Sequence, residues 1–503
     1  MEQKLSSEQN PPNNGLKPGA TPDATKNMKQ PSNTPKGQGQ LEALLSKQIR
    51  CVLIKGDPGT GKTTLAIDLL ARYGKGLYIS SRASLREAAL HNDVLRGLLE
   101  KNLISELEIT EKKGGLRFED YRLGGAEDVL RAVIKAPEIM GTDPLVILDS
   151  WDFFGKLMEP VERQKTEQAL FAMSEATNTK LLFVAETADQ TPIDYMVDAV
   201  LLLEDSVHEN HRIRRAIWKK LRSFEIPQRS YPYTLHGGTF SMMRGPYIPD
   251  IGSYATSNTA DLVDIVPKKH TTFTYSTGSE DLDAFLGGAG GFTRGSFVLL
   301  EMGEHVGSNW HVPLSASIGG NFIANGGCVV TIPSLGLSPR MIKIFTARHF
   351  SPEVVNSSLR ICHFYEGYAD VDPCFVQLDS SSAGKAEDDL IKISTALKGG
   401  KQRPCYFFLG IEAMEDILGA ENLGNIGAAT SIFLKKTGDL MICGVKHGSK
   451  LLTKLSNSTD IHLKMDQIDG ALMLYSVKPP SAIYNLYYDY SLGYPKVRLI
   501  PMV

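Results

Sequence analysis

A glycine-rich segment carries the residues with the clearest chemistry. Residues 56–63 read GDPGTGKT and match the pattern GxxxxGK[ST] in full. Glycines let the backbone wrap so that successive N–H groups point at phosphate oxygens. Lys62 offers a point charge to the β- and γ-phosphates, and the hydroxyl of Thr63 is a ligand for Mg²⁺. The segment predicts an ATP and Mg²⁺ site formed by Gly56, Asp57, Pro58, Gly59, Thr60, Gly61, Lys62, Thr63 and Thr64.

A carboxylate for the metal follows a second apolar run. Residues 145–150 read LVILDS, so Asp149 stands at the end of a predicted strand. Mg²⁺ dehydrates reluctantly and takes few protein ligands, so Asp149 is expected to hold it through a water shell. An Asp after four aliphatic residues is weak evidence alone, because strands often end in Asp at turns. Its pairing with the phosphate loop makes Asp149 the expected partner of Thr63 at the metal.

The elements that position these residues alternate between strands and helices. The loop lies between CVLIK and the amphipathic run TTLAIDLL, and further apolar runs are GLYIS, PLVILDS, KLLFVAE and AVLLLE. Near-continuous apolar strands are expected when helices cover both faces of a mainly parallel sheet. A second series follows with FVLLEMG, CVVTIP, CYFFLG and LMICG, and residues 299–303 align with residues 52–56. We therefore predict an α/β fold with two P-loop domains in tandem.

Composition indicates where these domains begin and end. Residues 1–38 are rich in Asn, Pro, Gln, Lys, Ser and Thr, so we expect a disordered tail, with a partner-binding arm as the alternative. Residues 246–270 are rich in turn-forming residues and are interpreted as a linker. The predicted domains are residues 39–245 and 271–503.

Charge and cysteine content narrow the class of protein. The 54 basic and 57 acidic residues nearly cancel, so no global field recruits nucleic acid or anionic membrane. The six cysteines form no CxxC pair, and buried reduced thiols are expected. Residues 306–339 lack Asp, Glu, Lys and Arg, but polar residues, glycines and prolines interrupt them, so we predict a buried helix followed by a core strand. The start of the chain lacks the apolar core of a secretory signal, so a cytoplasmic protein without a membrane partner is expected.

Four segments resemble the RecA superfamily, and within it the KaiC-like branch that includes the gas-vesicle regulatory protein D (GvpD) family. They are GDPGTGKTT, the strand ending LDS, residues 214–240 (RRAIWKKLRSFEIPQRSYPYTLHGGTF) and residues 276–288 (STGSEDLDAFLGG). The resemblance covers residues 41–245 strongly and residues 270–500 loosely. The segment STGSEDLDAFLGG resembles the sequence that usually precedes a domain of this branch. The first half has no such segment before its phosphate loop, and this favours the GvpD-like subgroup over KaiC itself. The resemblance implies RecA-like ATP-binding domains and regulation through a protein partner.

The resemblance also shows where the chain departs from an active enzyme. KaiC-like proteins carry paired glutamates after the strand that here reads GLYIS, but this chain has Arg82 and Ala83. Glu87 and Asp152 remain as candidate bases, and each is also explained as a solvated surface acid. We therefore expect ATP binding with slow turnover, with Lys62, Asp149, Asp152 and Glu87 as the candidate catalytic residues.

The second domain is predicted to be degenerate. Opposite Gly59, Gly61, Lys62 and Thr63 stand Val306, Ser308, Asn309 and Trp310, and opposite Asp149 stands Leu409 or Gly410. The phosphate cation and the metal ligands are lost, and an indole is expected to occupy the cavity. This domain is not expected to bind ATP in the usual way, so a scaffold, an oligomer face or a partner platform is its expected role.

A basic strand over residues 211–222 (HRIRRAIWKKLR) has three interpretations. A period of two predicts Ile213, Ile217 and Leu221 on one face, and on the other Arg212, Arg214, Trp218, Lys220 and Arg222. The KaiC-like resemblance implies that Lys220 and Arg222 reach the nucleotide of an adjacent subunit, in a homo-oligomer with nucleotide at its interface. The alternatives are a nucleic-acid patch in which Trp218 stacks on a base, which is not favoured, and a solvated edge strand.

These features together predict an ATP-binding, nucleotide-dependent regulator with slow ATPase activity that acts through protein partners. A non-hydrolysing ATP-sensing scaffold is the first alternative, because the usual catalytic glutamate is missing. A DNA-binding ATPase resembling a RecA paralogue is the second, and the net charge of −3 argues against it.

Overall fold

The computed structural model describes residues 38–503 apart from residues 102, 107–114, 121–125, 157, 244, 246–262, 289, 308, 366–371 and 426. The predicted disordered tail lies outside the described residues up to residue 37, as does the predicted linker from residue 246 to residue 262.

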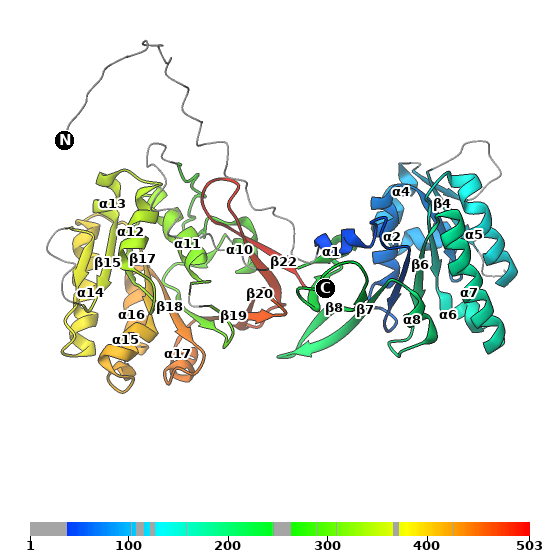
Figure 1. Cartoon of the computed structure of the whole chain (residues 1–503). Coiled ribbons are helices and arrows are strands. Elements are labelled where there is room, and N and C mark those ends of the chain that lie inside the picture. Colours follow the sequence, from blue (N-terminus) through cyan, green and yellow to red (C-terminus); the bar gives the residue numbers. More distant parts are fainter. Residues whose placement is uncertain are drawn as a thin grey trace, which may run out of the picture. The chain divides into compact units, whose positions relative to one another are not determined.

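The first ten-stranded sheet holds the phosphate loop (Figure 1). Its strands are β1 (Cys51–Lys55), β2 (Gly76–Ser80), β3 (Ile104–Glu106), β4 (Leu116–Asp120), β5 (Leu145–Asp149), β6 (Lys180–Ala185), β7 (Ala199–His208), β8 (His211–Leu221), β9 (Ser230–Thr234) and β10 (Ser241–Met242). Its helices are α1 (Gln38–Ala43), α2 (Lys62–Tyr73), α3 (Leu85–Leu90), α4 (Asp93–Glu100), α5 (Ala126–Met140), α6 (Trp151–Lys156), α7 (Pro160–Thr177) and α8 (Pro192–Met196), with a 3₁₀ turn at His236–Gly238.

The second ten-stranded sheet follows the same plan. Its strands are β13 (Phe297–Met302), β14 (Cys328–Ile332), β15 (Leu359–His363), β16 (Phe375–Gln377), β17 (Cys405–Gly410), β18 (Leu440–Lys446), β19 (Ile461–Ile468), β20 (Ala471–Lys478), β21 (Tyr484–Asp489) and β22 (Lys496–Pro501). A small two-stranded sheet, β11 (Thr274–Tyr275) with β12 (Phe292–Thr293), precedes it. The helices are α10 (Glu280–Phe285), α11 (Val312–Ala324), α12 (Pro339–Ala347), α13 (Pro352–Ser358), α14 (Ala383–Lys398), α15 (Ile411–Leu418), α16 (Ala428–Thr437) and α17 (Leu452–Ser458), with a 3₁₀ turn at Asn422–Asn425.

The strand order shows that the two halves are copies of one architecture. The first sheet runs β3-β4-β2-β5-β6-β1-β7-β8-β9-β10, and the second runs β16-β15-β14-β17-β18-β13-β19-β20-β21-β22. In each sheet the neighbours from the outer edge to β7 or β19 are parallel, and the remaining pairs are antiparallel. The predicted tandem α/β fold is confirmed.

Helices cover both faces of the first sheet, so its parallel strands are buried on each side. In β5, Leu145 and Ile147 face the apolar cluster under α2, whereas Val146 and Leu148 face the cluster under α5, α6 and α7. Burial on both faces explains why these strands read as continuous apolar runs. Each sheet has its own pair of apolar clusters. The limits 39–245 and 271–503 stay predictions.

The uncharged stretch over residues 306–339 folds as the sequence predicts. It contains the 13-residue helix α11, and then the buried strand β14. Among the described residues, no helix is both long and apolar enough to cross a membrane. All six cysteines are buried and unpaired, as predicted.

The predicted alternation along β8 is wrong in its second half. A bulge between the pairs Val200–Lys220 and Leu201–Trp218 leaves Lys219 exposed and shifts the register, so Leu221 lies on the same face as Trp218 and Ala216. The Trp218 side chain is only 1% exposed and belongs to the same cluster as Ala216 and Leu221. Because an extra residue in one strand reverses which side chains face inward, a strict period of two fails here.

Candidate nucleotide-binding site

The phosphate loop connects β1 to α2, as the motif requires, and its glycines are needed for steric reasons. Gly61 has φ +89°, and a Cβ there would meet the side chain of Leu235 at 2.7 Å. A Cβ on Gly56 would lie 2.0 Å from the carbonyl oxygen of Leu203. Larger residues at these positions would collide with their neighbours or strain the backbone. The loop can therefore fold close to β7 and still direct its N–H groups toward a phosphate.

Lys62 places its ammonium group inside the loop. Its Nζ atom donates to the carbonyl oxygens of Gly56 at 2.7 Å and of Asp57 at 2.8 Å. The side chain is 7% exposed. Burial lowers the pKa of Lys62, while the nearby carboxylate of Asp149 acts in the opposite direction. A cation is therefore held beside the N-terminus of α2, where a bound phosphate would also meet the positive end of the helix.

Thr63 and Asp149 meet as the sequence predicts. The Thr63 hydroxyl donates to Oδ2 of Asp149 at 2.6 Å, and the buried Tyr78 hydroxyl donates to the same oxygen. Asp149 is 3% exposed, and burial together with this carboxylate raises the pKa of Tyr78. One carboxylate and one hydroxyl oxygen form the sparse set of hard ligands that suits Mg²⁺. These residues fit the ion, with Tyr78 holding the carboxylate in place.

The two predicted candidate bases have other contacts. The Glu87 carboxylate accepts from the backbone N–H and the hydroxyl of Ser84, both at 2.9 Å, and closes a capping box at the start of α3. Asp152 accepts from the backbone N–H of Glu186 at 2.6 Å and lies 3.5 Å from Nη2 of Arg163. Capping gives Glu87 a structural role. Catalysis by either residue stays a prediction.

A residue missed from the sequence, Glu186, lies nearer the centre of the sheet. It follows β6, the strand between β1 and β5, so it stands between the ends of the strands that carry the phosphate loop and Asp149. Its carboxylate forms an ion pair with Arg82. Arg82 stands where the KaiC-like resemblance leads us to expect a glutamate. The signal in the sequence was the acid ending KLLFVAE, but the order of the strands was needed to interpret it.

Lys220 and Arg222 lie away from their own phosphate loop. Lys220 pairs with Val200 near the start of β7, whereas the loop follows the far end of β1. The Lys220 Nζ donates to the carbonyl oxygens of Asp194 at 3.1 Å and Tyr195 at 2.9 Å, and Arg222 lies 3.4 Å from Asp198. Burial lowers the pKa of Lys220, and the charge of Arg222 adds to this effect. Both residues are kept together at the opposite end of the sheet.

The second domain carries no replacement for the lost cation and metal ligands in the described part of its loop. A Cβ on Gly307 would lie 2.7 Å from the indole Nε1 of Trp310, so the indole packs on the loop. The face of β17 that carries Phe408 packs under α11, and Leu409 faces the other cluster. By this alternation Gly410, not Leu409, is the counterpart of Asp149. Ser308, the counterpart of Gly61, lies outside the described residues.

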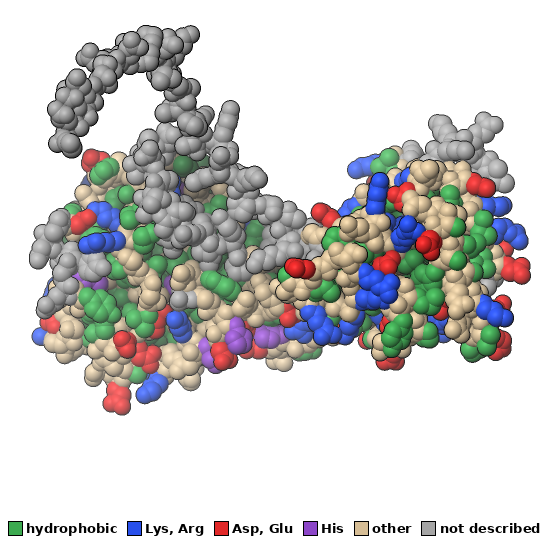
Figure 2. All heavy atoms as spheres, in the orientation of Figure 1, with side chains coloured by type: hydrophobic (Ala, Val, Ile, Leu, Met, Phe, Trp, Pro, Cys, Tyr) green, Lys and Arg blue, Asp and Glu red, His purple; other side chains and the backbone are tan. Residues whose placement is uncertain are grey.

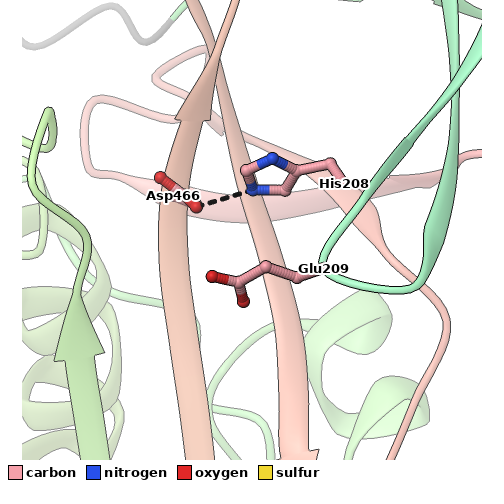
Figure 3. A group of neighbouring side chains, drawn as sticks. All are labelled: His208, Glu209 and Asp466. Carbon is pink, nitrogen blue, oxygen red and sulfur yellow. Dashed lines mark hydrogen bonds and ion pairs between the residues drawn. The ribbon is translucent and has the colours of Figure 1, made fainter.

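Polar contacts join β7 and β8 to β19 and β20. Figure 3 shows His208 facing Asp466, with Nε2 and Oδ2 2.8 Å apart, and Glu209 beside them. Residues of these types can bind a metal, but Oε1 of Glu209 already lies 2.6 Å from the ammonium group of Lys464. Since a lysine supplies the positive charge, this group is explained as an ion-pair network.

The charges of the basic strand do not favour a nucleic-acid interface. On the face drawn in Figure 2, Lys and Arg side chains stand among Asp and Glu side chains. Arg212, Arg214 and Arg215 of the basic strand are all paired with acidic side chains. Trp218 lies in the core, so stacking of its indole on a base is contradicted.

The fold and the site define a tandem α/β P-loop protein with one intact phosphate loop. Residues 44–222, which include the phosphate loop and Asp149, match the family model described as GvpD gas vesicle protein, P-loop domain. Protein GvpD2 of Halobacterium salinarum is 26% identical over 479 residues, which cover 90% of this chain and 93% of that protein. Protein GvpD1 of the same organism is 24% identical over 524 residues, covering 90% and 94%. DNA repair protein RadA of Halalkalibacterium halodurans is 25% identical over 182 residues, covering 34% and 36%.

Proposed function

We propose that the protein binds ATP with Mg²⁺ in its first domain and hydrolyses it slowly. It acts in the cytoplasm, through protein partners, as a regulator of the kind that the GvpD similarity implies. The observation that supports this most directly is the constellation of Lys62, Thr63 and Asp149, with the Thr63 hydroxyl 2.6 Å from the Asp149 carboxylate. The similarity to GvpD proteins along nine-tenths of the chain supports the biological setting.

Asp149→Asn tests the metal in this proposal. Asparagine keeps the shape of the side chain but removes the charge that would attract Mg²⁺. Mg²⁺ is expected to raise the ATP affinity of both proteins, but the rise is expected to be smaller in the variant by a factor of at least about ten. This factor corresponds to about 1.4 kcal/mol. Titration of a fluorescent ATP analogue with and without Mg²⁺ measures this effect. Glu138→Gln, which removes an exposed carboxylate from α5, is the matched control, and equal Mg²⁺ effects in all three proteins would contradict the assignment.

We expect slow turnover because Arg82 and Glu186 carry opposite charges at the carboxyl ends of the parallel strands. Arg82 brings a cation where related enzymes carry the glutamate, and Glu186 is held by it in an ion pair. Polarisation of a water molecule by Glu186 would require this pair to open. We assign Glu186 as a further candidate base beside Glu87 and Asp152. The same ion pair favours the second candidate function, a scaffold that senses ATP without hydrolysing it.

We also propose that the chain forms a homo-oligomer in which the nucleotide lies at the interface between subunits. Lys220 and Arg222 lie at the end of the sheet opposite their own phosphate loop. Residues placed there are suited to contact the nucleotide of a second copy of the chain, where a cation would stabilise the γ-phosphate. Assembly would then depend on the nucleotide bound.

Arg214 is the proposed connection between the phosphate loop and the second half of the chain. Its Nη1 donates to the carbonyl oxygen of Gly59 at 3.0 Å, and its Nε donates to that of Val503 at 2.6 Å. The side chain is 6% exposed. A change in the loop on ATP binding would therefore alter a partly buried hydrogen bond to the segment after β22.

Arg214→Met tests this connection, because methionine keeps an apolar stem and loses both donors. We expect ATP to change amide hydrogen exchange in residues 496–503 of the wild type, and this change to be lost in the variant while ATP affinity stays within about threefold, or 0.7 kcal/mol. Arg212→Met is the control, because Arg212 is exposed and forms its ion pair with Asp205. The same ATP-induced change in Arg214→Met as in the wild type would refute the connection.

A further inference from the structure

The ion pair between Arg82 and Glu186 lies just beyond Asp149, at the carboxyl end of the first sheet. Strand β5 runs between β2 and β6. Asp149, the last residue of β5, is paired with Ser80 of β2 and with Val184 of β6. Arg82 and Glu186 each follow two residues after these partners, and their side chains meet across the end of β5. The ion pair therefore spans the edge of the sheet that carries the proposed metal ligand.

The backbone beside Arg82 is fixed to the strand that carries Asp149. The N–H of Ser81 donates to the carbonyl oxygen of Asp149 at 2.8 Å, and the N–H of Ser150 donates to the hydroxyl of Ser81 at 3.0 Å. The N–H of Arg82 itself donates to the hydroxyl of Ser80 at 3.3 Å. Because the backbone is held and the side chain is long, the guanidinium can change its partner without a movement of the loop.

The ion pair is accessible to a ligand, and opening it costs little. The side chain of Arg82 is 48% exposed and that of Glu186 is 31% exposed. Ion pairs at such positions contribute little net stability, because water screens the charges and two long side chains must be ordered. A phosphate group carries more negative charge than one carboxylate, and the planar guanidinium can donate to two of its oxygens at once. A phosphate within reach of Arg82 would therefore displace Glu186.

The charge of Arg82 acts on the residues of the phosphate loop and of the metal site. Burial lowers the pKa of Lys62, the carboxylate of Asp149 opposes this effect, and the charge of Arg82 adds to it. Burial and the Asp149 carboxylate raise the pKa of Tyr78, and the charge of Arg82 acts against them. Lys62 and Arg82 are thus two cations near one site, and a polyphosphate would relieve the repulsion between them.

We propose that Arg82 distinguishes ATP from ADP: its guanidinium pairs with Glu186 when no γ-phosphate is present, and holds the γ-phosphate when ATP is bound. ADP, which ends at the β-phosphate, leaves the ion pair with Glu186 closed. The inference rests on the proposed ATP site of the first domain and adds the residue that reads the state of the nucleotide there. Because Glu186 is a candidate base only when it is unpaired, the same exchange makes turnover depend on Arg82.

Arg82→Met tests this role on the full chain, because methionine keeps an apolar stem and loses the guanidinium. We expect the affinity for MgATP to fall at least about tenfold, while the affinity for MgADP changes less than about twofold. Displacement of a fluorescent ATP analogue by each nucleotide measures the two affinities. Arg86→Met is the matched control, because Arg86 is an exposed arginine of α3 and its removal is expected to leave both affinities unchanged.

Glu186→Gln tests the exchange of partners from the other side. Removal of the carboxylate charge frees Arg82, so MgATP is expected to bind at least about threefold tighter, with the affinity for MgADP unchanged. In the double variant Arg82→Met/Glu186→Gln this gain is expected to disappear, because no guanidinium is left to be freed. A gain that persisted in the double variant would indicate simple repulsion between Glu186 and the γ-phosphate, and it would overturn the exchange.

Two results separate this inference from the proposed ATP site. Equal losses of MgATP and MgADP affinity in Arg82→Met, or no loss of either, would overturn the role of Arg82 and leave the ATP site standing. If Lys62→Ala bound both nucleotides as the wild type does, the ATP site would be wrong, and this inference would fail with it. A melting temperature close to that of the wild type establishes that each variant is folded.

Discussion

Replacing Lys62 by alanine is expected to lower the affinity for MgATP at least about 100-fold and to reduce phosphate release to background. Lys62 is 7% exposed, and its ammonium group lies inside the phosphate loop, where it donates to the carbonyl oxygens of Gly56 and Asp57. Hydrogen bonds to charged groups contribute about 1.5–3 kcal/mol each, and a 100-fold loss corresponds to about 2.7 kcal/mol. Titration with a fluorescent ATP analogue and an assay of Mg²⁺-dependent phosphate release measure the two effects.

Lys135→Ala is the matched control for this experiment. Lys135 is an exposed lysine of α5, so its removal changes the net charge equally and is expected to leave ATP binding unchanged. A melting temperature close to that of the wild type establishes that Lys62→Ala is folded. If that variant bound MgATP as the wild type does, the phosphate loop would not be the ATP site. If it bound weakly but the wild type released no phosphate, the protein would be an ATP sensor.

The phosphate loop was predictable because its chemistry is local. Residues 56–63 are contiguous, and the flanking strand and helix fix the direction of their N–H groups. Asp149 was predictable because the carboxyl ends of parallel strands share one edge of a sheet. The hydroxyl of Tyr78 was not, because only the pairing of β2 with β5 brings it to the Asp149 carboxylate.

The ion pair of Arg82 with Glu186 shows what the sequence leaves undetermined. The two residues are far apart in the chain, and their meeting depends on the order β1-β6-β5-β2. Apolar runs identify strands without giving their order. The tandem fold was nevertheless predictable, because both halves repeat the same succession of strands and helices, and the two sheets share one strand order outside small differences at the β3 and β16 edge.

The second domain differs from the first at the strand ends where the first domain has its polar site. Loss of the lysine and of the metal carboxylate removes the reason to keep a polar pocket at the end of the sheet. Trp310 packs on the loop, and Gly410 replaces the carboxylate. On the same side of the sheet, the aromatic side chains of Tyr406 and Phe408 are buried in the cluster under α11. The strand ends of the second domain therefore carry an indole and a glycine where the first domain carries an ammonium group and a carboxylate.

Trp218→Ala is expected to destabilise the first domain by about 3–5 kcal/mol, the usual cost of truncating a large aromatic residue in a core. The indole is 1% exposed and packs in the cluster that also contains α2. Its Nε1 has no acceptor among the residues that the structure describes. Trp218→Phe is therefore expected to cost much less, because phenylalanine fills most of the volume and buries no unpaired donor. Urea unfolding followed by circular dichroism compares the two variants.

Lys219→Ala is the control for the same strand, because Lys219 is exposed at the bulge and its removal is expected to change stability by less than about 0.5 kcal/mol. The comparison also decides between two roles for the basic strand. An exposed tryptophan that stacks on nucleic acid would leave stability unchanged when replaced by alanine, and only retention on DNA would fall. A core tryptophan gives the opposite result. If Trp218→Ala changed the free energy of unfolding by less than about 1 kcal/mol, the indole would not be a core side chain. The nucleic-acid interpretation would then have to be considered again.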